Sequence, residues 1–119
     1  MRHILYIEDD ADNRKVMRSF FTMHEHLELD FAETAELGLK KMAAKQFDLI
    51  LMDIKLPGMD GHTLTKQLKA QQDFKYVPII AITAYALPED IENASDVFDA
   101  YITKPVDFAI LTKALNRFL

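Results

Sequence analysis

The chain has 119 residues, of which 50% are hydrophobic and 28% charged, with no cysteine and a formal net charge of -5. This length fits one domain, residues 1–119, and the composition excludes an intrinsically disordered chain. The mild acidic excess and interspersed charges disfavour direct nucleic-acid binding, and the absence of cysteine excludes a disulfide framework.

The N-terminal apolar run is short and meets the acids Glu8, Asp9 and Asp10, which is unlike a signal peptide. No apolar run approaches the roughly 20 residues of a membrane-spanning helix. We therefore predict a cytoplasmic protein with no membrane partner.

Short apolar runs alternate with amphipathic stretches along the chain. In chain order, we predict a strand at 4–7, a helix at 12–24, a strand at 27–32, a helix that begins at Thr34, a strand at 48–53, a helix at 62–71, a strand at 78–84, a helix at 88–96, a strand at 100–103 and a helix at 108–118. Helical spacing predicts these buried or nearly buried positions: Val16, Met17, Phe20, Phe21, Leu37, Leu39, Met42, Ala43, Leu64, Leu68, Phe108, Leu111, Leu115 and Phe118.

The first, third and fourth predicted strands are continuous apolar runs, which is typical of parallel strands covered by helices on both faces. We therefore predict an α/β fold with a doubly wound parallel sheet. In such sheets, ligands bind beyond the carboxyl ends of the strands.

Polar residues follow the predicted strands at that edge. They are Glu8-Asp9-Asp10, Asp53, Thr83-Ala84 and Lys104-Pro105. Carboxylates packed together repel one another, and a hard divalent cation such as Mg²⁺ relieves the repulsion. A carboxylate can also act as a nucleophile toward phosphorus, with the cation, a lysine, a hydroxyl and a backbone N–H neutralising the phosphoryl oxygens. The pattern predicts a magnesium-dependent phosphoryl site.

These residues, with Tyr101 three positions before Lys104 and the loop Pro57-Gly58-Met59-Asp60-Gly61, resemble the receiver domains of two-component response regulators over essentially the whole chain. The resemblance is to the stand-alone, chemotaxis-regulator-like type. It implies a flavodoxin-like sheet of five parallel strands in the order 2-1-3-4-5 with five helices.

The resemblance also implies roles for individual residues. Asp53 is the expected phosphoacceptor, Asp9 a direct magnesium ligand, and Glu8 a ligand that acts through water. Asp53 itself and the backbone carbonyl of Lys55 complete the metal shell, which Mn²⁺ could also occupy.

Further roles concern the phosphoryl group. Lys104, the hydroxyl of Thr83 and the backbone N–H of Ala84 are expected to contact its oxygens. Thr83 and Tyr101 form the expected switch pair, and the bond to Pro105 is expected to be cis.

The expected function is phosphorelay signalling rather than catalysis on separate substrates. A histidine kinase or histidine phosphotransfer protein would donate the phosphoryl group, and a downstream protein would read the switched surface. The large side chains of Lys55 and Tyr85 are expected to slow self-dephosphorylation.

Several alternatives stay open. For Asp10 and Asp12, helix capping and a role in the site are equally good explanations. A pseudo-receiver interaction module, or a receiver that is part of a larger regulator or hybrid kinase, is an alternative for the whole chain. A magnesium-dependent phosphatase fits poorly, because Lys55 stands where a second acid would be needed. Residues 93–100 depart from the family pattern, since no glycine precedes the last strand.

Overall fold

The computed structural model describes residues 1–56, 58, 61–84 and 97–119. The elements are β1 (Arg2–Ile7), α1 (Ala11–Thr22), β2 (Leu27–Ala32), α2 (Ala35–Ala44), β3 (Leu49–Asp53), α3 (Gly61–Lys69), β4 (Ile79–Thr83), β5 (Ala100–Thr103) and α5 (Phe108–Phe118). The helix predicted at 88–96 lies outside the described residues, as do Pro57, Met59, Asp60 and Tyr85.

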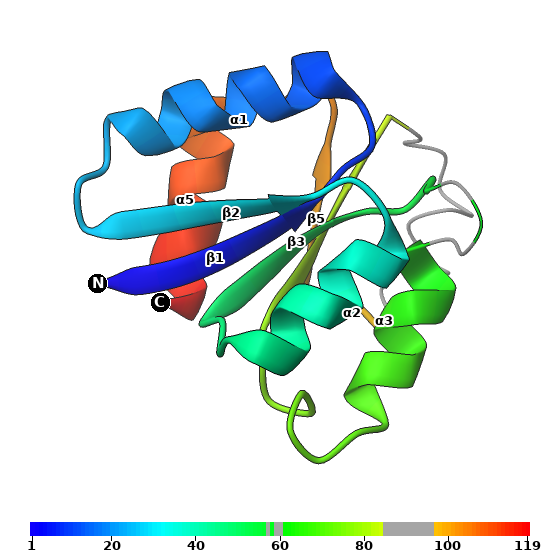
Figure 1. The fold of residues 1–119 in the computed structure, drawn as a ribbon. Coiled ribbons are helices and arrows are strands. Elements are labelled where there is room, and N and C mark those ends of the chain that lie inside the picture. Colours follow the sequence, from blue (N-terminus) through cyan, green and yellow to red (C-terminus); the bar gives the residue numbers. More distant parts are fainter. Residues whose placement is uncertain (57, 59–60, 85–96) are drawn as a thin grey trace.

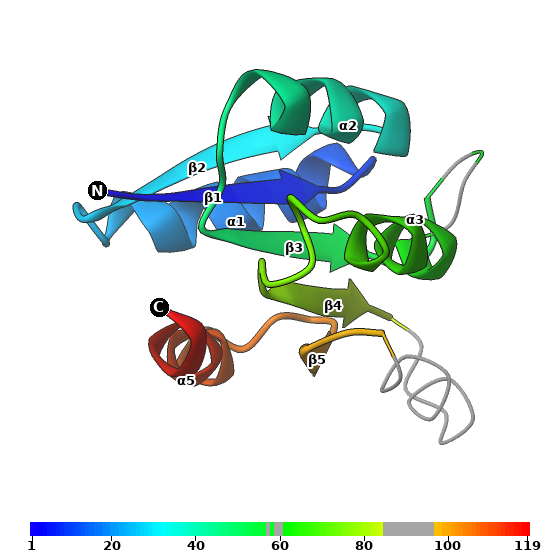
Figure 2. The same ribbon diagram turned by 90° about the horizontal axis from the view of Figure 1, so that it is seen from below.

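The strands form one parallel sheet in the order β2-β1-β3-β4-β5. Figures 1 and 2 show α1 and α5 on one face of this sheet and α2 and α3 on the other. The predicted doubly wound, flavodoxin-like fold is confirmed. Because all strands run the same way, their carboxyl ends share one edge.

A separate buried cluster fills each side of the sheet. Under α1 and α5, the buried side chains of Met17, Phe20, Phe21, Leu111 and Leu115 pack on β1, β3 and β4. Phe108 and Phe118 are partly buried against the same cluster.

Under α2 and α3, the second cluster contains Met42, Leu64 and Leu68. Continuous burial of β3 and β4 on both faces explains why their sequences do not alternate.

The predicted inward face of α2 is wrong in part. Leu37 and Leu39 are 42% and 37% exposed, and Ala43 is also exposed, whereas Gly38 is buried. A β-carbon at Gly38 would lie only 2.6 Å from Ile7 Cδ1. The helix therefore approaches β1 through its smallest residue, which turns the leucines away from the sheet.

Val16 in α1 is likewise outside the core, at 46% exposure. Its neighbour Met17 takes the inward position at 1% exposure, because successive helical residues point about 100° apart.

Side-chain caps begin three of the helices. Asp10 Oδ1 accepts hydrogen bonds from the backbone N–H of Asp12 (2.8 Å) and Asn13 (3.0 Å), so Asp10 is the N-cap of α1. Thr34 and Asp107 cap α2 and α5 in the same way. Asp12 lies in the first turn of α1 rather than at its cap. None of the described helices has the length and apolar character needed to span a membrane.

Candidate functional site

Three carboxylates meet at the carboxyl edge of the sheet. Glu8 and Asp9 directly follow β1, and Asp53 is the last residue of the neighbouring strand β3. One carboxylate oxygen from each of the three lies within 4.8 Å of the others. Glu8 is 0% and Asp53 5% exposed, whereas Asp9 is exposed.

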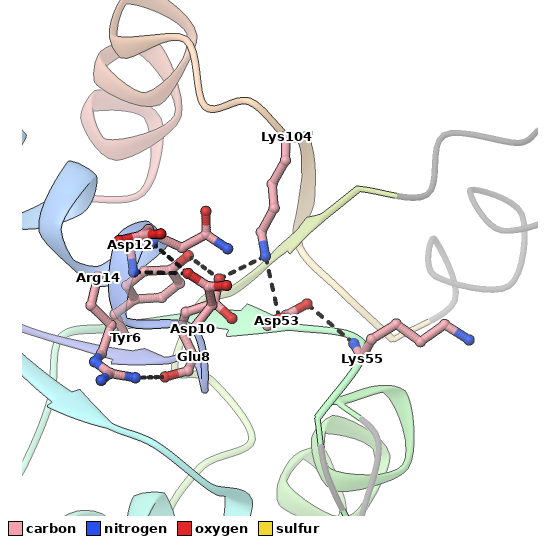
Figure 3. Close-up of polar contacts among 9 residues, drawn as sticks. Tyr6, Glu8, Asp10, Asp12, Arg14, Asp53, Lys55 and Lys104 are labelled. Atoms are coloured by element: carbon pink, nitrogen blue, oxygen red, sulfur yellow. Dashed lines mark hydrogen bonds and ion pairs between the residues drawn. The ribbon is translucent and has the colours of Figure 1, made fainter.

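Lys104 reaches this cluster from the end of β5. Its Nζ lies 2.6 Å from Glu8 Oε1 and 3.3 Å from Asp53 Oδ2 (Figure 3). The backbone N–H of Lys104 donates to Thr83 O at 2.7 Å, and the Lys104–Pro105 peptide bond is cis. One ammonium group therefore faces two buried carboxylates, so these three side chains together carry an excess of negative charge when both acids are ionised.

Burial raises the pKa of the Asp53 carboxyl to about 7, and the neighbouring carboxylate of Glu8 adds to the increase. The positive charge of Lys104 and a hydrogen bond from the Lys55 backbone N–H (3.1 Å) offset only part of it. Near neutral pH, a proton and a cation would therefore compete for the Asp53 carboxylate.

Glu8 is buried too, and burial alone would raise its pKa. Interactions with Asp53, Lys104 and Tyr6 outweigh burial, so the pKa of Glu8 is lowered. The pKa of Lys104 is raised, because attraction to Glu8 and Asp53 exceeds the effect of its own burial. Glu8 and Lys104 are thus the charged pair of the cluster.

The two oxygens of Glu8 have different surroundings. Oε1 accepts from Lys104 Nζ and from the Tyr6 hydroxyl at 3.0 Å. Oε2 is buried and has no hydrogen-bond partner within the described part of the chain. An unpaired buried carboxylate oxygen is costly, and a cation or its bound water would satisfy it.

The acidic turn, Glu8-Asp9-Asp10 after β1, is also held in place by its backbone. Glu8 N–H donates to Ala32 O at 2.9 Å, and an Arg14 guanidinium nitrogen donates to Glu8 O at 2.9 Å (Figure 3). Arg14 also lies 3.7 Å from a carboxylate oxygen of Glu33. Asp10 is the N-cap of α1 and is not one of the three clustered carboxylates.

Two other predicted site residues lie close by. Thr83 ends β4 at 0% exposure, next to Asp53 on β3. Tyr101 on β5 is half-buried against the cluster under α2 and α3. Ala84 and Lys55 are exposed at the same edge, and Tyr85 lies outside the described residues.

Gly61 was predicted only as the last residue of the loop at 57–61, and the structure makes it the first residue of α3. Its N–H donates to Ile54 O at 2.7 Å, and a β-carbon there would overlap the carbonyl oxygen of Asp53. The start of α3 can therefore pack against the end of β3 only with glycine at this position.

Sequence reasoning also missed Tyr6 and Arg14. Tyr6 stands two residues before Glu8, and side chains two apart on a strand share one face, so the strand period could have indicated its contact. No comparable pattern marks Arg14, whose contact with Glu8 O depends on how α1 is placed relative to the end of β1.

The carboxylate oxygens of this cluster suit a hard divalent cation. Residues 4–116 match the response regulator receiver domain family. The chain therefore belongs to this family, and it is a receiver domain of two-component signalling.

Two curated relatives illustrate the range of the family. The chain is 34% identical over 120 residues to the regulatory protein VanRB of Enterococcus faecalis, a match that covers 98% of this chain and 51% of that protein. It is 29% identical over 119 residues to the polar-differentiation response regulator DivK of Brucella ovis, covering 99% and 96%. The chain spans about half the length of VanRB, and only 5% of the hybrid signal transduction histidine kinase M of Dictyostelium discoideum, to which it is 32% identical.

Among solved structures, the receiver domain of the sensor histidine kinase PA1611 from Pseudomonas aeruginosa PAO1 is similar, with a TM-score of 0.87 and 31% identity. The match covers 98% of this chain and 96% of that one. That structure holds a magnesium ion coordinated in its active site cleft.

Proposed function

We propose that this receiver domain accepts a phosphoryl group from a phosphohistidine onto Asp53 and thereby switches a protein-interaction surface. The observation that carries the proposal is the buried Asp53 carboxylate beside Glu8, Asp9 and Lys104. A carboxylate oxygen of Asp53 forms the new P–O bond while the P–N bond to the histidine breaks, and the imidazole nitrogen leaves with the electron pair.

The residues fit a magnesium ion. Asp9 and Asp53 would bind it directly, Glu8 through water, and the backbone carbonyl of Lys55 would complete the protein's share. Bound there, the ion would neutralise charge on a phosphoryl oxygen. Mn²⁺ accepts the same oxygen ligands and would substitute for it.

The chain's own groups would neutralise the other phosphoryl oxygens. Lys104 is one such group, and the Thr83 hydroxyl and the Ala84 backbone N–H are the others. Once Thr83 bonds the phosphoryl group, Tyr101 moves inward behind it. Phosphorylation thereby shifts an existing conformational equilibrium rather than creating a new fold.

The proposed partners are a histidine kinase or histidine phosphotransfer protein as donor and a downstream protein as target, in the cytoplasm. Residues 1–119 act as one signalling domain and not as an enzyme with separate substrates. Bulk at Lys55 and Tyr85 slows self-dephosphorylation in this proposal, so smaller residues at both positions should speed the decay of the phosphorylated form.

The test is intact mass after incubation with Mg²⁺ and acetyl phosphate. We expect the wild type to gain one phosphoryl group and Asp53→Asn to gain none. Asp48→Asn, which replaces an aspartate just before β3 at the opposite edge of the sheet, is the control and should gain one. No gain in the wild type would support a pseudo-receiver, and a gain in Asp53→Asn would identify a different acceptor.

A further inference from the structure

Tyr6 places a hydroxyl group beside the buried acid of the candidate metal site. Tyr6 and Glu8 are two residues apart along one strand and its extension, so both side chains point to the same side. The Tyr6 hydroxyl donates to Glu8 Oε1 at 3.0 Å (Figure 3). Tyr6 is 1% exposed, and its ring centroid lies 6.4 Å from that of Phe31 in the core under α1 and α5. Packing therefore fixes the ring, and the ring fixes the hydroxyl.

Because of this contact, the two carboxylate oxygens of Glu8 differ in their hydrogen bonds. Oε1 is bonded by Tyr6 and by Lys104, whose Nζ lies 2.6 Å away. Oε2 has no hydrogen-bond partner within the described residues, although it is buried. Two donors approach Oε1, one from β1 and one from the residue after β5, and together they restrict rotation of the carboxylate. Oε2 is then the oxygen available to a cation or its water.

Lys104 alone would restrict the carboxylate less well. Its ammonium group sits on a flexible stem and also contacts Asp53 at 3.3 Å. A carboxylate held by Lys104 only would follow that lysine when it shifts toward Asp53. The Tyr6 hydroxyl has no such freedom.

We propose that Tyr6 is a positioning residue for the metal site, whose hydroxyl holds Glu8 Oε1 so that Oε2 faces the water through which Glu8 would contact the bound cation. The proposal rests on the proposed function, since it assumes that Glu8, Asp9 and Asp53 hold a divalent cation. Groups that orient metal ligands typically change metal affinity about 10-fold to 100-fold when removed.

A purely structural account of the contact also exists. A buried tyrosine hydroxyl needs an acceptor, and Glu8 supplies one, so the bond could serve the fold alone. The two accounts differ in what happens when Glu8 is shortened. Aspartate at position 8 keeps a carboxylate but draws it back from the hydroxyl by one methylene group.

The experiment measures the dissociation constant of Mg²⁺ alone by isothermal titration calorimetry, with no phosphodonor present. We expect Tyr6→Phe, which removes only the hydroxyl, to weaken Mg²⁺ binding about tenfold. Tyr76→Phe removes a hydroxyl from a side chain that is 82% exposed and should bind Mg²⁺ as the wild type does. Melting temperatures without Mg²⁺ show whether each variant is folded.

The same pair is then compared in a Glu8→Asp background. Positioning predicts that Tyr6→Phe changes Mg²⁺ affinity less than about twofold there, because the coupling between the two side chains is already lost. An equal loss in both backgrounds, or wild-type affinity in Tyr6→Phe, overturns the proposal while Mg²⁺ binding by the wild type upholds the proposed function. A wild type that binds no Mg²⁺ overturns both.

Discussion

Two lysines of this domain each bridge a pair of carboxylates, with very different consequences. Lys45 Nζ lies 3.2 Å from Glu28 and 3.3 Å from Asp30, and Lys104 Nζ lies 2.6 Å from Glu8 and 3.3 Å from Asp53. The distances are similar, and in the second group the pKa of the Asp53 carboxyl is raised to about 7.

The difference is burial. The side chains of Lys45, Glu28 and Asp30 are 35%, 43% and 32% exposed, so water solvates all three charges. The side chains of Lys104, Asp53 and Glu8 are 16%, 7% and 0% exposed. In a poorly solvated cluster one lysine does not compensate two carboxylates, and the excess charge raises proton affinity or attracts a metal. Ion pairing alone therefore does not mark the functional site.

The largest expected effect separates the two lysines by function. Lys104→Ala should slow phosphorylation of Asp53 by about 100-fold, because a preorganised charge at the phosphoryl oxygens is lost. Lys45→Ala should leave the rate within about twofold, since an exposed pair contributes little. The measurement is the time course of intact mass with acetyl phosphate and Mg²⁺. Equal rates in the two variants would refute the comparison.

A smaller effect concerns pH. If Asp53 holds Mg²⁺ as proposed, the metal binds its ionised form, so a proton competes with the metal below the pKa of about 7. Affinity should therefore rise about tenfold between about pH 6 and pH 8 and change little above that. Calorimetric titrations across this range test it. Asp53→Asn should show weaker binding without this rise, and a flat profile in the wild type would contradict the raised pKa.

The sign for stability follows from the same shift. The pKa of Asp53 is higher in the folded than in the unfolded state, so its protonated form favours folding at low pH. In metal-free protein this contribution is lost as the pH rises from about 4 through 7. Asp53→Asn should accordingly increase the unfolding free energy of the metal-free protein at pH 8 by on the order of 1–2 kcal/mol. The measurement is the melting temperature, which should rise.

A weaker effect is expected from Arg14, which holds the backbone of the acidic turn. Arg14→Ala removes the 2.9 Å bond to Glu8 O and should weaken Mg²⁺ binding about threefold to fivefold. Glu33→Gln removes the charge of the other Arg14 partner and leaves the Glu8 bond, so affinity should stay within about twofold. If both variants weaken binding equally, the Arg14–Glu33 pair rather than the backbone bond is responsible.

The smallest effect is expected at the exposed cluster. Lys45→Ala should lower the melting temperature slightly at low ionic strength, and the difference from wild type should vanish in about 1 M salt, where exposed charges are screened. Differential scanning calorimetry at two salt concentrations measures this. A decrease that persists in high salt would point to the contact of Lys45 with the Phe47 ring, at 5.7 Å, instead.

The sequence by itself determined the parallel α/β fold and the residues that gather at the carboxyl edge. Continuous apolar runs mark doubly covered strands, and parallel strands bring their ends together whatever the details of packing. Thus the described strands and helices lie within a few residues of their predicted bounds.

Tertiary structure decided what depends on distance and solvent. The outward orientation of Leu37 and Leu39 depends on the close packing of Gly38 against Ile7, a contact between distant parts of the chain. The pKa of Asp53 is raised first by its own burial and then by Glu8 beside it, and no local pattern encodes either effect. The hydroxyl of Tyr6 contacts Glu8 only because packing directs it there. The sequence therefore determines which residues make up the site, and the tertiary structure determines how they are oriented.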